Sequence, residues 1–108
     1  MIIINVAKDF SETPGGRLIS EGPYSGELFR EDVLKPRYDE AIANSDKLQI
    51  NMDGCFGFPS SFIEESFGGL VRTLNGTDIL ACIEFISNDQ PSLVDYIHKC
   101  VQEAMGAV

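Results

Sequence analysis

The segment Lys47–Met52 constrains the fold more than any other stretch of the sequence. Polar and apolar residues alternate in it, which places Leu48, Ile50 and Met52 on one side of an extended chain and polar side chains on the other. A period of two is typical of a strand whose sheet has one face against a core and the other in water. We therefore expect a sheet with helices packed mainly on one face.

Three further strands and three helices are predicted around this segment. The β-branched run Ile2–Val6 predicts a first strand, and the turn signal Pro14-Gly15-Gly16 predicts a hairpin that returns through Arg17–Ser20. The apolar stretch Ile79–Ile86 predicts a central strand. Helical spacing of apolar residues predicts helices from Ser25 to about Asn44 with a kink near Pro36, from Ser60-Ser61 to Asn75, and from Ser92 to Met105.

The order of these elements, ββαβαβα, indicates an α/β fold. Strands that alternate with helices imply right-handed parallel crossovers. The predicted sheet is therefore mixed, mainly parallel and four-stranded, and it begins with an antiparallel hairpin. A chain of 108 residues has room for one hydrophobic core, so we expect residues 1–108 to form a single domain.

Charge and cysteine content exclude several classes of function. Seventeen acidic and eight basic residues give a net charge of −9, which repels nucleic acid and anionic membranes. No apolar run approaches the roughly 20 residues of a membrane helix, and the N-terminus does not read as a signal peptide, so we expect a cytoplasmic protein. Three cysteines without a Cys-x-x-Cys pair and one histidine indicate no metal site and no cofactor.

The stretch Asp53–Glu65 is the most informative for function, because it leads from the carboxyl end of a strand to the start of a helix, where ligands commonly approach open α/β sheets. Ser61 and Glu64 have the spacing of a capping box, a structural role. Ser60 comes one residue earlier, at the positive end of the helix, where an added phosphate would be favoured. The residue pattern leaves both interpretations open.

Arg17 and Arg30 stand out in an acidic chain. If they converge near Ser25, they could bind a phosphate or a partner's carboxylate, whereas surface or ion-pair roles are the structural alternative. Ser25 also offers a hydroxyl to cap the helix that follows it. Gly68-Gly69 inside a predicted helix costs helix stability, so we expect these glycines to allow a close approach to the sheet or to a partner.

A family resemblance extends over nearly the whole chain. It is carried by Pro14–Arg17, Ser25-Gly26-Glu27 with Phe29-Arg30, Asp53-Gly54, Pro59–Phe62 and Glu65 with Phe67–Leu70. In these segments the sequence resembles a bacterial family of STAS-like domains of uncharacterised function. That family is similar to STAS domains, the fold of anti-sigma factor antagonists, in which a strand–loop–helix turn carries a phosphorylatable serine. The resemblance puts Ser60 at this regulatory position.

The resemblance implies a regulatory, non-enzymatic protein-interaction module. Its partner would be a protein such as a histidine-kinase-like ATPase, docked on the surface around residues 57–67 and switched by phosphorylation of Ser60. The candidate contacts are Gly57, Phe58, Phe62 and Glu65. The alternative is a domain that binds a small anionic ligand or a nucleotide at the helix start Ser60-Ser61. Homodimerisation through an edge strand or through Phe56 and Phe58 is a third hypothesis.

Overall fold

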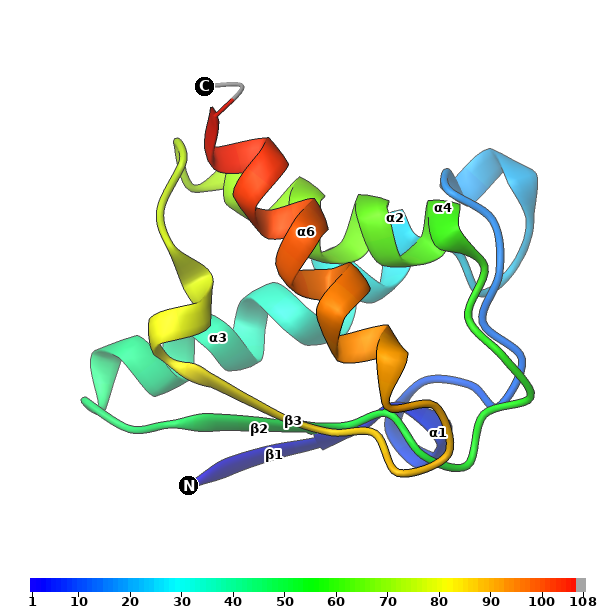
Figure 1. Cartoon of the computed structure of the whole chain (residues 1–108), viewed down its shortest axis with the longest axis horizontal. Helices are drawn as coiled ribbons and strands as arrows, with labels where there is room; N and C mark the ends of the chain where they lie inside the picture. The colour runs from blue at the N-terminus through cyan, green and yellow to red at the C-terminus, as the bar shows by residue number, and fades with distance from the viewer. Residues whose placement is uncertain (107–108) are drawn as a thin grey trace.

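The computed structural model describes residues 1–106 and contains a three-stranded parallel sheet (Figure 1). The strands β1 (Ile2–Asn5), β2 (Leu48–Asn51) and β3 (Ile83–Ile86) lie in the order β1-β2-β3. Leu48 and Ile50 are fully buried, whereas Gln49 and Asn51 between and after them are partly exposed. The predicted α/β class and the one-sided burial of the middle strand are therefore confirmed.

The predicted fourth strand and antiparallel hairpin are wrong. The chain leaves β1 in a short helix, α1 (Val6–Asp9), whose start is capped by the Asn5 side chain, which accepts a hydrogen bond of 3.1 Å from the backbone N–H of Lys8. This helix turns the chain away from the sheet edge, so Arg17–Ser20 does not return beside β1. Residues Ile19–Glu21 instead form a 3₁₀ turn, η1, which the Glu21 carboxylate closes by accepting from the backbone N–H groups of Arg17 and Leu18.

The first long helix contains a wide turn before its proline. It consists of α2 (Gly26–Phe29), the π-helical η2 (Arg30–Leu34) and α3 (Lys35–Ala43), joined without a break in helical backbone angles. The Ser25 hydroxyl accepts a 3.1 Å hydrogen bond from the N–H of Leu28, which confirms the predicted cap. The ring of Pro36 would crowd the carbonyl of Asp32 in a regular α-helix, and Asp32 lies in the π-helical turn. The kink predicted near Pro36 is therefore present as this π-helical turn.

A second long helix follows β2, and a third ends the chain. The second combines α4 (Ser60–Ile63), the π-helical η3 (Glu64–Gly68) and α5 (Gly69–Thr73), and the third is α6 (Ser92–Gly106). The predicted strand over 79–86 is shorter than expected, because the Asp78 side chain caps a 3₁₀ turn, η4 (Ile79–Ala81). The prediction that it is the central strand is wrong, since β3 lies at an edge of the sheet and β2 in the middle. No helix within residues 1–106 is both long enough and apolar enough to cross a membrane.

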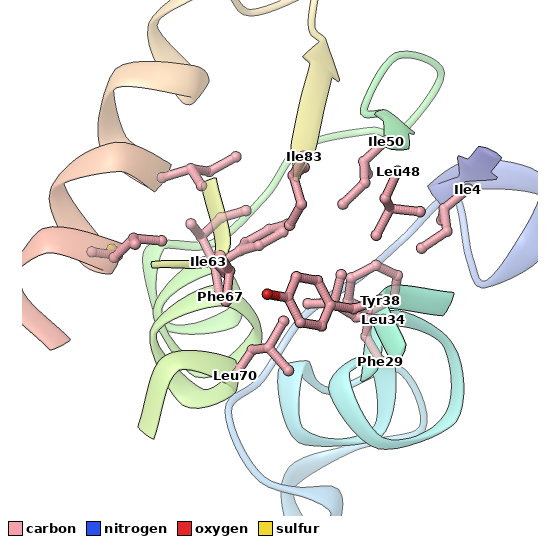
Figure 2. Close-up of a cluster of buried hydrophobic side chains, with 14 of the residues drawn as sticks. Ile4, Phe29, Leu34, Tyr38, Leu48, Ile50, Ile63, Phe67, Leu70 and Ile83 are labelled. Atoms are coloured by element: carbon pink, nitrogen blue, oxygen red, sulfur yellow. The ribbon is translucent and has the colours of Figure 1, made fainter. Parts of the chain in front are cut away.

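The core lies between the sheet and the helices, which share one side of it (Figure 1). Side chains from β1, β2 and β3 point toward Phe29 and Phe67 on the two long helices (Figure 2). These helices approach most closely at Gly26, where an added Cβ would lie 2.6 Å from the Phe62 carbonyl oxygen. The second long helix is therefore held tightly, and its first residue, Ser60, has a fixed place at the edge of the molecule.

Candidate functional site

The loop between β2 and α4 is tied to the loop that follows β3. The Asp53 carboxylate accepts hydrogen bonds from the backbone N–H of Asp89, at 2.9 Å, and from the Asn88 amide, at 3.0 Å. Asp89 in turn accepts a 3.0 Å bond from the N–H of Gly54, whose φ of +92° suits glycine alone. Because each loop binds the other, the segment that leads to Ser60 is ordered rather than free.

The same loop is also fastened to the segment that follows α1. The N–H of Phe56 donates to the carbonyl of Glu12 at 2.8 Å, and the Cys55 thiol donates to the carbonyl of Ser11 at 3.4 Å. Between the two segments lies an open cleft of about 410 Å³, lined by Thr13, Pro14, Phe56, Gly57, Phe58 and Pro59. We call this cleft, together with Ser60 beside it, the docking corner.

Phe56 is the most unusual side chain of the docking corner. It is 84% exposed, more than any other large hydrophobic residue among residues 1–106. Its neighbour Phe58 is half-buried, with its ring centroid 5.9 Å from that of the buried Phe62. The corner therefore combines an aromatic ring anchored in the core with a second ring that projects into water from a hydrogen-bonded loop.

Ser60 is exposed and is the first residue of α4. The predicted capping box of Ser61 and Glu64 is wrong, because the helix starts two residues earlier than a cap at Ser61 requires: Pro59 is the N-cap, and no side chain caps this end. On the adjacent helix α6, the phenol of Tyr96 interacts with the Cys100 thiol, which raises the pKa of Tyr96, while its interaction with Ser60 opposes that rise.

One turn after Ser60 on the same helix, the carboxylates of Glu64 and Glu65 form ion pairs with three of the four arginines of the chain. Arg30 binds Glu65 at 2.5 Å and also donates to its backbone carbonyl at 3.0 Å. Arg17 lies 2.5 Å from Glu64 and 3.3 Å from Glu65. Arg72 completes the set with two hydrogen bonds to Glu64, at 2.7 and 3.1 Å. We call these five residues the ion-pair cluster.

The ion-pair cluster is electrostatically satisfied. Hydrogen bonds from Arg72 and, to a smaller degree, from Arg17 hold the pKa of Glu64 below its ordinary value, against the opposing effect of burial. The pKa of Arg17 is raised mainly by its bond to Glu64. Both Arg30 and Glu65 are only 14% exposed at the side chain. The cluster therefore serves mainly to join the segment around Arg17 and the start of η2, at Arg30, to η3.

The predicted anion site at Arg17, Ser25 and Arg30 is not assembled. The two arginines converge on Glu65, and Ser25 is fully buried as the cap of α2. Of the two roles considered for the arginines, the ion-pair role is the one that the contacts support. A ligand anion would have to displace the chain's own carboxylates.

Gly68 and Gly69 serve the ion-pair cluster rather than the sheet or a partner. A Cβ at Gly68 would collide with the Glu64 carboxylate, and a Cβ at Gly69 would collide with the Arg30 guanidinium. The role of Arg72 was not predicted from the sequence. The signal that could have found it is the spacing of Arg72 four residues after Gly68 and eight after Glu64, which places all three on one helix face.

The candidate partner contacts are only partly available. Gly57 is exposed and Phe58 half-exposed, but Phe62 is fully buried against Phe29, so it is wrong as a contact residue. Glu65 is largely buried in the ion-pair cluster. The accessible part of the predicted surface is therefore residues 57–61, and Phe56, just before it, takes the place of Phe62 as the main aromatic group.

The cysteines give no sign of a nucleophile. Burial, followed by the negative charges of Glu12 and Asp89, raises the pKa of the Cys55 thiol to about 11, so the reactive thiolate is scarce at neutral pH. Burial also raises the pKa of Cys100. In the part of the chain that the structure describes, no three His, Cys, Asp or Glu side chains are grouped so that they could hold a metal ion.

Comparison with known proteins gives one match. The family described as STAS-like domain of unknown function (DUF4325) matches residues 25–93, which is more than half of the chain. No curated protein and no solved structure matches significantly. The matched segment runs from the cap of α2 through the docking-corner loop to the first residues of α6, and it confirms the resemblance seen in the sequence. The chain belongs to this family of STAS-like domains.

Proposed function

We propose that this chain is a regulatory, non-enzymatic protein-interaction domain that binds a partner protein at the docking corner. The observation that carries the proposal is Phe56, which is 84% exposed beside an apolar cleft, on a loop held by hydrogen bonds from Gly54 to Asp89 and from Phe56 to Glu12. A single exposed apolar residue needs no explanation, but an exposed aromatic ring beside a second ring and two prolines resembles the anchors that dominate protein interfaces. Order in the loop reduces the entropy lost on binding.

The proposed partner is a histidine-kinase-like ATPase. Family membership supports this class of partner through the similarity of STAS-like domains to anti-sigma factor antagonists. The position of the docking corner supports it as well, since the corner occupies the turn between β2 and α4 that carries the regulatory serine in those antagonists. The partner would cover Phe56 and fill the cleft beside Phe58.

Isothermal titration calorimetry at low salt tests this proposal, with the chain titrated into a candidate ATPase encoded beside its gene. Phe56→Ala is expected to weaken binding about ten-fold or more, because it removes the exposed anchor. Ile42→Ala is the matched control, since Ile42 is also a large exposed side chain, at 54%, but lies on α3. Absence of a complex with such ATPases, or equal losses in the two variants, would argue against the proposal.

We further propose that phosphorylation of Ser60 releases the partner. Ser60 is exposed at the edge of the docking corner, and the start of a long helix favours negative charge. The neighbouring Glu64 and Glu65 are paired with arginines, which reduces their repulsion of a phosphate. A bulky, strongly hydrated group at this position would obstruct the apolar contact.

Mass spectrometry of the protein from its native cell tests the modification directly, and a phosphate on another residue alone would count against it. In the binding assay, Ser60→Glu is expected to weaken the complex several-fold, whereas Ser60→Ala keeps the affinity of the unmodified chain. Equal affinities of the two variants would leave the docking proposal standing but would remove the switch.

A further inference from the structure

We propose that the segment recognised at the docking corner is basic: a stretch of the partner in which lysine or arginine residues flank one large apolar side chain. This inference rests on the proposed function, because it names the chemistry of the partner at that same surface. Two observations support it: the cleft of the docking corner is apolar, and the carboxylates in the segments beside it form no ion pairs within residues 1–106.

Three carboxylates surround the loop that bears Phe56. Glu12 is exposed and is joined to Phe56 through the backbone hydrogen bond between them. Asp53 lies in the loop itself and accepts from the N–H of Asp89, and Asp89 accepts from the N–H of Gly54. None of the three forms an ion pair with a cationic side chain within residues 1–106. Burial is the main cause of the raised pKa of the Cys55 thiol, and the charges of Glu12 and Asp89 add to it.

The nearest arginines do not cancel this charge. Arg17 follows the cleft residue Pro14 by three positions, but its guanidinium is directed to Glu64 and Glu65. The carboxylates of Glu12, Asp53 and Asp89, in the segments beside the docking corner, therefore have no ion-pair partner within residues 1–106, in a chain whose net charge is already −9. A second copy of this chain, or an acidic partner, would bring like charges together, whereas a basic segment would be attracted and would bind faster at low salt.

The cleft accounts for the apolar part of the recognised segment. A volume of about 410 Å³ between Pro14 and the rings of Phe56 and Phe58 accommodates one large side chain with room for its backbone. Aromatic side chains pack well on other rings in an offset or edge-on arrangement. A segment with tryptophan or leucine between basic residues thus offers an apolar side chain to the cleft and positive charge to the carboxylates of the segments beside it.

A short synthetic peptide tests this inference. The probe is a blocked peptide with one tryptophan between two lysines on each side. This chain contains no tryptophan, so the fluorescence of the peptide alone reports binding. One control peptide carries glutamate in place of every lysine. A second control peptide carries serine in place of tryptophan; because it lacks the fluorescent residue, it is labelled with a dye and its binding is measured by fluorescence anisotropy. We expect binding of the basic tryptophan peptide, with a blue shift of its emission, and at least about ten-fold weaker binding of both controls.

Two pairs of variants locate the binding. Phe56→Ala should weaken binding of the peptide about ten-fold, and Ile42→Ala should not. The double variant Glu12→Gln, Asp89→Asn should weaken it several-fold and flatten its salt dependence between about 0.02 and 0.2 M, because both substitutions remove charge and keep an acceptor oxygen. Glu40→Gln with Glu103→Gln removes the same charge from α3 and α6 and is the matched control.

The outcomes separate this inference from the proposed function. No binding of the basic tryptophan peptide, or binding that the control charge pair reduces as much as the Glu12 and Asp89 pair, overturns the inference. If the ATPase complex depends on Phe56 but not on Glu12, Asp89 or salt, the corner still docks a partner and only its basic character is wrong. If neither the peptide nor the ATPase depends on Phe56, both proposals fail.

Discussion

The docking corner, at the first residue of one helical stretch, and the ion-pair cluster, one turn later, show opposite ways of using charged and aromatic residues. In the ion-pair cluster, three guanidinium groups meet two carboxylates, and glycines leave the room they need. At the docking corner an aromatic ring faces water and the nearby carboxylates have no cationic partner within residues 1–106. Charges that pair with one another hold the fold, whereas an exposed ring and carboxylates without an ion-pair partner, on an ordered loop, are available to bind something else.

The two regions nevertheless depend on each other through Arg17. The segment that carries it also supplies Thr13 and Pro14 to one wall of the cleft. The cluster fixes this segment to η3, and backbone hydrogen bonds from Gly15 to Tyr24 and from Gly26 to Gly16 fix it from behind. Substitutions in the cluster should therefore cost stability, and substitutions in the corner should cost binding. Measuring both stability and binding for each variant tests this division of roles between the two regions.

The largest loss of stability is expected beneath the cluster, at Gly26. In Gly26→Ala the new Cβ would lie 2.6 Å from the Phe62 carbonyl and 3.0 Å from the Cβ of Glu65, so one helix must move. We expect the free energy of unfolding to fall by about 3 kcal/mol, measured by urea denaturation with circular dichroism. Gly22→Ala is the control, since nothing lies within 4 Å of its Cβ position. Equal stabilities would mean that the close helix contact does not constrain the fold.

A smaller loss is expected from the buried ion pair. Arg30→Met keeps much of the side-chain volume but leaves the Glu65 carboxylate without its main partner at 14% exposure. The free energy of unfolding should fall by about 2 kcal/mol, less than for a fully buried pair because Arg17 still reaches Glu65. Arg37→Met is the control: this fourth arginine forms an exposed pair with Glu40 at 3.5 Å, worth at most about 0.5 kcal/mol. Similar losses in the two variants would contradict the structural role of the cluster.

The pH dependence of stability gives a third, smaller effect. The pKa of Glu64 is lowered in the folded chain from its ordinary value of 4.5, chiefly by hydrogen bonds from Arg72 and Arg17. A carboxyl group with a depressed folded pKa stabilises the fold above its unfolded pKa and loses that contribution as the pH falls through the folded value. Stability should therefore decline below about pH 4.5, by about 1 kcal/mol from this group.

Glu64→Gln provides the check on this assignment. The variant should be less stable at pH 7 and should lose less stability than the original chain between about pH 5 and pH 3. Thermal denaturation followed by circular dichroism over this range measures both. Parallel pH profiles would show that other carboxylates account for the acid sensitivity.

The features that could be predicted from the sequence are those fixed by neighbouring residues. The alternation in β2, the Ser25 cap and the irregular turn before Pro36 all depend on contacts within a few positions. The prediction of a hairpin after the first strand was wrong for a local reason as well. Signals for a strand and for a turn were both present, but the Asn5 side chain starts a helix between them. A one-turn helix has too little periodicity to be recognised.

The candidate site shows why the rest could not be predicted. Arg17 and Glu64 are 47 residues apart, so their bond follows only from the fold. It also explains the failed capping box, because Glu64 binds arginines rather than the helix start. Exposure is likewise a tertiary property: Phe56 and Phe62 have the same chemistry and lie six positions apart, yet one is 84% exposed and the other is fully buried.

The smallest effect on stability is expected at Phe56, and it is the sharpest test of the comparison. A ring that is already in water in the folded chain gains little from folding, so Phe56→Ala should change the free energy of unfolding by no more than about 0.5 kcal/mol. Phe58→Ala, two residues later, should cost about 1–2 kcal/mol because that ring packs on Phe62. Urea denaturation of both variants, beside the binding assay, separates the two roles. If Phe56→Ala proves as destabilising as Phe58→Ala, the exposed ring is part of the fold, and a loss of partner binding in that variant no longer identifies a docking surface.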